Sequence, residues 1–215
     1  MSIRQTQEEW SLLSPTGKVA ATTQSRLELI GMTATINNPS QPVFRAGTYL
    51  DAAETASIPV TRTATANQIH ASLMRLRTGV TLNQLRFSVT TAGAALTTTR
   101  FGLYTLGPTF YPDKLLLDSG DLPTDAIAVV DYNFPTNMYF PPGWLAVANI
   151  CNGTPTFRSF SRAATAPIPE SEPYTGLSRN NIWYLSLAYG ALPSTFPAGC
   201  PVFGIDTPQV SFRVV

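Results

Sequence analysis

The chain is 215 residues long, 44% hydrophobic and only 13% charged, with a formal net charge of +1. Its length and hydrophobic share suffice for one large buried core, and the low charge leaves much of the surface to Thr, Ser, Asn and Pro. The basic residues stand singly, as at Arg62 and Arg86, or form the short patch Arg75-Leu76-Arg77, which we interpret as the solvated face of a strand. No basic run could follow a phosphate backbone, so we expect no nucleic-acid partner.

The first 63 residues differ in composition from the rest of the chain. Arg4, Glu8 and Glu9 stand where a signal peptide needs an apolar core, and no run approaches the ~20 apolar residues of a membrane span. We therefore expect synthesis in a cytoplasm and no membrane insertion. Residues 1–63 are predicted to form an extended N-terminal arm, with strand character at 24–36, which becomes ordered on a partner or on the main domain. The alternative is that they supply the first strands of the same domain.

Strand signals recur at regular spacing from about residue 64 to the C-terminus. Strands are predicted near 67–77, 82–91, 98–105, 114–118, 126–132, 143–150, 155–160, 182–189 and 208–215. No segment with a helical period is long enough for a core helix, and the 18 prolines oppose one. The predicted fold class is therefore all-β, an antiparallel β-sandwich of jelly-roll-like type over residues 64–215.

Two stretches without periodicity interrupt the strand pattern. Residues 161–181 are expected to form a long surface loop that faces a partner, and residues 192–206, rich in Pro and Gly, are expected to cross over the sandwich. The two cysteines, Cys151 and Cys200, match neither a disulfide framework nor a zinc pattern. We expect two free thiols, although only their separation in the fold decides whether they could pair.

The chain offers little for catalysis. His70 is the only histidine and stands in a strand pattern with no nucleophile turn, so a structural or surface role is expected. Five aspartates lie close together in the sequence: Asp113, Asp118, Asp121, Asp125 and Asp131. Turn contexts such as Asp118-Ser119-Gly120-Asp121 favour turn roles over a calcium site or a pair of catalytic carboxylates. With no nucleotide-binding motif, we expect no enzyme activity, no cofactor and no metal.

Several aromatic residues lie at strand ends, where sugar-binding rings are often found. Trp144 follows Pro141-Pro142-Gly143 and precedes an apolar strand, so it is expected to fill the sandwich core. Better candidates for ligand binding are Tyr111, beside Pro112, and Trp183, after the Asn180-Asn181 turn. Packing roles are the alternative for both.

Three blocks in the middle of the chain resemble a known family. They are Arg100-Phe101-Gly102-Leu103-Tyr104, then Tyr111-Pro112 with Leu115-Leu116-Leu117-Asp118-Ser119-Gly120, then Pro142-Gly143-Trp144-Leu145-Ala146. In this order they resemble a jelly-roll module of tailed-bacteriophage and prophage structural proteins, with its patterns R-x-G-[IL]-Y, Y-P-x-x-L-L-x-[DA]-[SA]-G and P-G-x-[YW]-W-L-A. Residues 190–197 and 208–214 look similar too, whereas the corner at Gly143-Trp144-Leu145 is shorter than the family's two-aromatic version. The resemblance covers about residues 64–215, and residues 1–63 match nothing in it.

The resemblance implies a non-enzymatic structural protein located in a virion, as a tail fibre, spike, baseplate part or head decoration. The leading expectation is a tail fibre or spike module, displayed for host attachment and anchored by the N-terminal arm. The alternatives are a capsid decoration or cement protein and a carbohydrate-binding module for host polysaccharide. Expected partners are other virion proteins of the capsid, neck or tail, further copies of the chain with a trimer favoured, and a host surface glycan.

Overall fold

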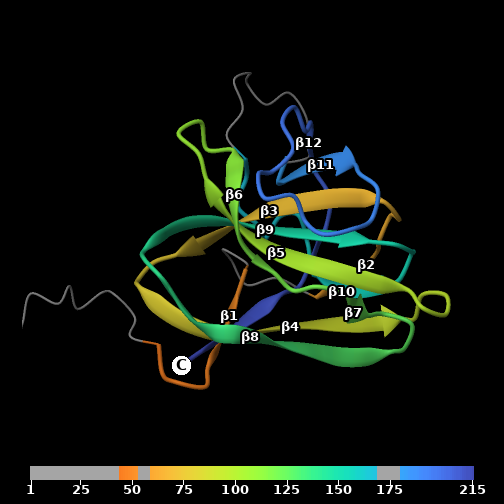
Figure 1. The fold of residues 1–215 in the computed structure, drawn as a ribbon, viewed down its shortest axis with the longest axis horizontal. Helices are drawn as coiled ribbons and strands as arrows, with labels where there is room; N and C mark the ends of the chain where they lie inside the picture. Colours follow the sequence, from red (N-terminus) through yellow and green to blue (C-terminus); the bar gives the residue numbers. More distant parts are fainter. Residues whose placement is uncertain (1–43, 53–58, 169–179) are drawn as a thin grey trace, which may run out of the picture. The chain divides into compact units, whose positions relative to one another are not determined.

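The computed structural model describes residues 44–52, 59–168 and 180–215, so the strand expected at 24–36 lies outside the described residues. All regular structure in these ranges is β-strand, arranged in two antiparallel sheets that pack as a sandwich (Figure 1). The predicted all-β, jelly-roll-like class is confirmed. The described residues contain no helix with the length and hydrophobicity that a membrane crossing requires.

Sheet A is built around one long central strand. Its described strands are β1 (Tyr49–Asp51), β2 (Val60–Thr63), β4 (Val80–Thr91), β8 (Ala128–Phe140), β10 (Thr156–Phe160), β13 (Thr207–Pro208) and β14 (Ser211–Val214). Strand β8 pairs along one edge of β4, while β14 and β10 pair with successive parts of the other edge. β1 pairs with β14, and both β2 and β13 pair with β10.

Sheet B has the order β12-β11-β3-β9-β5-β6, with β7 also paired to β5. Its described strands are β3 (Gln68–Leu76), β5 (Thr98–Leu106), β6 (Pro112–Asp118), β7 (Leu122–Pro123), β9 (Gly143–Cys151), β11 (Ile182–Ser186) and β12 (Val202–Phe203). From β2 to β5 and again from β7 to β11, each successive strand lies in the opposite sheet. This repeated crossing is what makes the sandwich jelly-roll-like and brings distant segments together.

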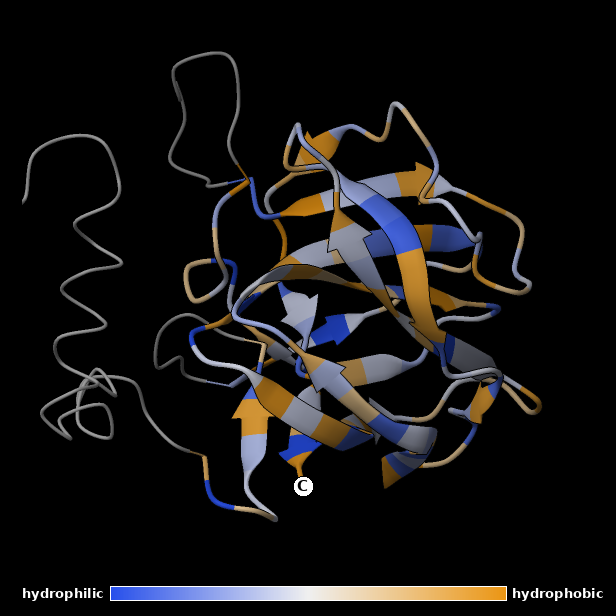
Figure 2. Cartoon of the chain, turned by 60° about the vertical axis from the view of Figure 1, so that its left-hand side comes forward, coloured by the Kyte–Doolittle hydropathy of each residue, from blue (hydrophilic) through white to orange (hydrophobic). Residues whose placement is uncertain are grey.

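The sandwich core forms because β4 turns one apolar face towards sheet B. Leu82, Leu85, Phe87 and Val89 are all at most 2% exposed, and a bulge at Asn83 in the pairing with β14 explains why the spacing between the first two is three residues. Phe87 packs against a phenylalanine of β5 and one of β10, with ring centroids 4.8 Å and 5.8 Å away. Figure 2 shows the resulting alternation of hydrophobic and hydrophilic residues along the strands.

A second core covers the outer face of sheet B. On β3 and β9 this face presents Ile69, Ala71, Leu73, Ala146, Ala148 and Ile150. The loop after β11 lies over them and buries Leu192, Phe196 and Cys200, so the predicted crossing of residues 192–206 is confirmed. The Tyr104 hydroxyl donates to the Pro193 carbonyl at 2.9 Å, which fixes the loop to β5. The central strands β3 and β9 of sheet B are therefore buried on both faces.

The second core corrects the prediction for Trp144. This side chain is half-buried and belongs to the outer cluster, where it packs edge-on against Phe110 and lies beneath the Arg75 guanidinium at 5.5 Å. The sandwich core receives Leu145 and Val147 instead. Both faces of β9 are apolar, so alternation alone could not show which face meets sheet A.

Two boundaries also differ from the predictions. β1 and β2 are strands of sheet A, so the sandwich begins before residue 64, as the alternative interpretation held. Of the loop expected at 161–181, residues 169–179 lie outside the described residues. The part that precedes them is not a surface loop, because Ala164, Ala166 and Ile168 are at most 6% exposed.

The two cysteines are free thiols, as predicted. Cys151 belongs to the sandwich core, whereas Cys200 belongs to the outer core. Sheet B lies between them, so no disulfide could form without dismantling the fold.

Candidate functional site

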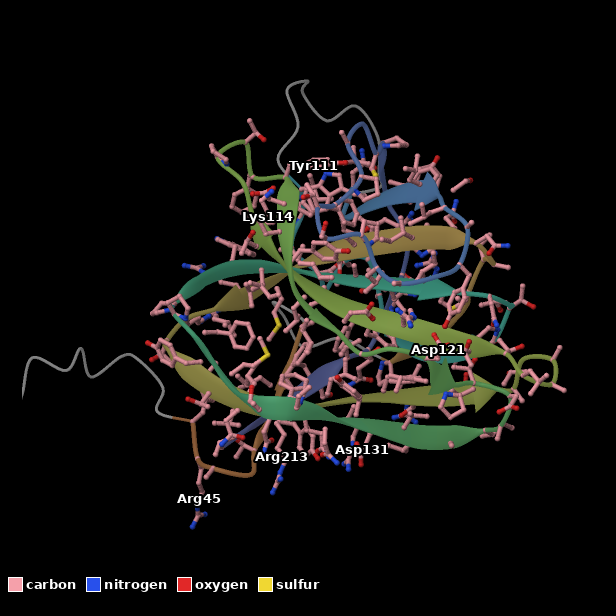
Figure 3. The ribbon with its side chains drawn as sticks, viewed as in Figure 1. Arg45, Tyr111, Lys114, Asp121, Asp131 and Arg213 are labelled. Carbon is pink, nitrogen blue, oxygen red and sulfur yellow. The ribbon has the colours of Figure 1, made fainter. Side chains whose placement is uncertain are left out.

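The two aromatic residues singled out from the sequence, Tyr111 and Trp183, lie in contact. Their ring centroids are 5.7 Å apart in an edge-to-face arrangement, and Tyr111 also packs against Phe196 at 5.9 Å. The Tyr111 hydroxyl donates to the Pro197 carbonyl and accepts from the Cys200 amide, while Trp183 is 3% exposed. Both therefore pack the outer core, and Figure 3 shows Tyr111 just before the start of β6. These contacts favour the packing alternative over ligand binding.

The clustered aspartates divide into turn and strand roles. Asp118 accepts a hydrogen bond from the amide of Gly120, which has a φ of 68°, and this is the predicted turn role. Arg100 ties the turn together through ion pairs of 2.7 Å to Asp118 and 2.7 Å to Asp121. Asp131 instead lies within β8, where it pairs with Arg86 on the outer face of sheet A (Figure 3). Asp118, Asp121 and Asp131 are thus all held in ion pairs with arginine, whereas Asp125 accepts from the backbone amide of Leu96.

A different group of polar residues meets at the seam between the sheets. Arg62 stands on β2 of sheet A, and its Nη2 lies 3.0 Å from Nδ1 of His70 on β3 of sheet B. The Gln68 Oε1 lies 2.7 Å from Nε2 of the same ring. We assign the His70 proton to Nε2, because that tautomer donates to Gln68 and leaves Nδ1 to accept from Arg62. His70 thus has the expected structural role.

The segment that links β12 to β13 completes the seam. It includes Asp206, whose backbone carbonyl accepts from Nη1 of Arg62 at 2.9 Å. The Asp206 carboxylate accepts from the backbone amide of Arg162 at 2.9 Å. The Arg62 guanidinium is thus held by a carbonyl and an imidazole, two acceptors without charge.

Two hollows share Arg62 in their lining. One, of about 440 Å³, is lined by Arg62, Arg162, Gly204, Ile205 and Asp206. The other, of about 350 Å³, is lined by Arg62, Thr63, Thr65, Gln68, Tyr184, Phe203 and Ile205. Both lie within the size range of small-molecule sites. Register places Tyr184 beside His70 on β3, and its ring packs edge-on against Phe203 at 5.5 Å.

At neutral pH the Arg62 side chain is charged and the His70 side chain is neutral. Burial lowers the pKa of Arg62 to about 10, against the opposing charge of Asp206, so the guanidinium stays protonated at neutral pH. Burial, and then the charge of Arg62, lower the pKa of His70 to about 3, so the imidazole is neutral. A ring with this pKa is a poor proton acceptor near pH 7. The arrangement suits the binding of an anion better than acid–base chemistry.

Sequence reasoning missed this site. Arg62 was one of the scattered basic residues, although it follows Val60 by two positions and so shares the inward face of β2. A charged residue two positions from an apolar one, and therefore on the same face of a strand, is the signal that could have indicated this site. The described residues contain no group of three His, Cys, Asp or Glu side chains placed to hold a metal ion.

The fold and the seam define a double-sheet, jelly-roll-like β-sandwich with a polar site where the sheets meet. No family model matches the chain, and no curated protein matches it. Among solved structures the chain is similar to a chain of the infectious bursal disease virus Gx strain, at 11% identity and a TM-score of 0.30. The match covers 78% of this chain and 41% of the viral chain. A likeness this distant carries no argument about function.

Proposed function

We propose that the chain is a non-enzymatic structural protein of a virion, of the tail fibre or spike type, displayed for host-surface attachment. Residues 1–43, outside the described part, would serve as the anchor to capsid, neck or tail proteins. The displayed unit would be the sandwich, assembled with further copies of itself, with a trimer favoured.

One observation carries the proposal: the sequence blocks that resemble phage structural proteins assemble into one structural unit. The first block forms β5, the second forms β6 and its turn, and the third begins β9. These three strands are neighbours in sheet B. Residues 190–197, which share the resemblance, supply Leu192 and Phe196 to the outer core over the same sheet. Blocks far apart in sequence thus specify a single packed layer, which is how a shared module is expected to look.

The location of the chain in purified particles tests the proposal. Virions from the host that produces this chain would be labelled with antibodies against the sandwich and viewed by electron microscopy. Label on tails or tail tips supports the fibre or spike assignment. Label over the head would replace it with the capsid decoration alternative, and absence of the chain from particles, checked by mass spectrometry, would refute a virion role.

The oligomeric state is a separate test. Light scattering on the full chain after gel filtration should report a homo-oligomer with the mass of a trimer. A strict monomer at high concentration would count against the fibre or spike arrangement, because such parts depend on symmetric assembly.

A further inference from the structure

We propose that the seam around Arg62 binds an acidic saccharide. The guanidinium would bind the acid group, and the sugar ring would pack against the aromatic rings of Tyr184 and Phe203. This deepens the proposed attachment role and rests on it for its biological meaning. The binding itself can be tested without reference to a virion.

The first step is that no carboxylate contacts the charged group of Arg62, although Asp206 lies near enough to act on it electrostatically. No Asp or Glu of the described residues lies within ion-pair distance of this guanidinium, whereas the ion pairs of Arg86, Arg100 and Lys114 are all formed elsewhere. Among the described residues its hydrogen-bond partners are one carbonyl and the His70 ring, which leave N–H donors unused. A largely buried cation is costly without an anionic partner, and both hollows reach Arg62. A bound anion would supply that partner.

The second step is the way the guanidinium is held. His70 and Gln68 come from β3, while Arg62 comes from β2 in the other sheet, so the side chain is braced from across the sandwich. Because His70 is neutral, it orients the guanidinium without offsetting its charge. A planar guanidinium held in one orientation favours the bidentate geometry with which arginine binds carboxylate or phosphate groups.

The third step is the chemistry of the smaller hollow. Phe203 is 51% exposed, a large value for a phenylalanine whose ring packs against Tyr184. Thr63, Thr65 and Gln68 line the same hollow and offer hydroxyl and amide groups. Aromatic rings accept the apolar face of a sugar, and the polar groups can bond its hydroxyls. A free inorganic anion would use only Arg62, whereas an acidic sugar would use the whole hollow.

The test uses the full chain and four probes: D-glucuronic acid, N-acetylneuraminic acid, D-glucose and inorganic phosphate. Affinity would be measured by NMR titration of the wild type and three variants. Arg62→Gln removes the charge, and Phe203→Ala removes an exposed part of the ring wall. Arg158→Gln is the matched control, because Arg158 is an exposed arginine on the neighbouring strand β10 and lines neither hollow.

We expect at least one of the two sugar acids to bind and glucose to bind at least about tenfold more weakly. Arg62→Gln should weaken binding of the acid by about tenfold or more, Phe203→Ala should weaken it several-fold, and Arg158→Gln should leave it unchanged. Phe203→Ala keeps the test decisive even if Arg62→Gln does not fold.

The proposal is overturned if neither sugar acid binds, if glucose binds equally well, or if binding survives Arg62→Gln. Phosphate binding as tight as that of the sugar acid, with no effect of Phe203→Ala, would reduce the seam to a plain anion site and overturn the saccharide assignment. None of these results would affect the proposed virion role, which depends on where the chain lies in particles.

Discussion

Lowering the pH from 7 to 4.5 should destabilise the protein through His70. The pKa of this ring is about 3 in the folded protein because of burial and the nearby charge of Arg62, against an ordinary value of 6.5. A base with a depressed pKa binds its proton more readily in the unfolded chain, so stability is fully present above pH 6.5 and is lost as the pH falls towards 3. The loss is about 1.4 kcal/mol per pH unit, or about 2.5 kcal/mol between pH 7 and pH 4.5.

The assay is urea unfolding at several pH values between 7 and 4.5, for the wild type and for His70→Gln. Glutamine is neutral throughout this range, so the variant should lose most of the pH dependence even if it is less stable at pH 7. Hydrogen bonds to Arg100 and Arg86 hold the pKa values of the Asp121 and Asp131 carboxyl groups below their ordinary value. Their contributions are lost only at lower pH, so the window above 4.5 isolates the histidine.

NMR provides an independent reading, because His70 is the only histidine in the chain. Its ring resonances in the folded protein should stay at their neutral positions down to pH 4.5. A titration midpoint near 6.5 in the native state, or an unfolding free energy that does not change between pH 7 and pH 4.5, would refute the reasoning about the seam.

Three further predictions concern the backbone, the outer core and the thiols. Gly143 has a φ of 152° with open space around it, so Gly143→Ala should cost about 1–3 kcal/mol of backbone strain, whereas Gly190→Ala, also in open space but without a positive φ, should change stability little. Equal shifts of the two urea midpoints would contradict this. A methyl group added by Gly102→Ala would collide with Leu192 and lie 3.0 Å from the Leu117 carbonyl, at a cost of about 1–3 kcal/mol. Part of that cost should disappear when Leu192→Ala is the background, and strictly additive losses would argue against the contact. Burial raises the pKa of Cys151 to about 11 and also raises the pKa of Cys200. A disulfide reagent at pH 8 should therefore label both thiols only after denaturation. Rapid labelling of the native protein would be inconsistent with their burial.

Much of the fold was predictable because long strands carry their own periodicity. Each of the nine predicted strands overlaps an observed one, and β3 and β5 agree to within one residue at each end. The short strands β1, β2, β7, β12 and β13 were missed, since two to four residues are too few to show a period of two. β8 continues past Pro135 to Phe140, well beyond the predicted end at 132, because residues 134–137 bulge out opposite the single residue Asn83 and pairing with β4 resumes at Met138.

The candidate site was beyond prediction for a different reason. Arg62, His70, Tyr184 and Phe203 come from four strands in two sheets, and the chain crosses the sandwich repeatedly between the second and the third. No local sequence pattern indicates which strands of the two sheets lie next to each other at the seam. Trp144 shows the same limit on a smaller scale, because a strand apolar on both sides does not reveal which side faces the other sheet.

The burial of the central strands of sheet B on both faces determines where the molecule can open. β9 lies between β3 and β5, with the sandwich core on one side and the outer core on the other. Its amides are expected to exchange with deuterated solvent only when the whole domain unfolds. β8 pairs with β4 alone among the described strands, so its amides should exchange through local fraying. β9 would therefore report global stability, whereas β8 at the edge of sheet A would open first on heating.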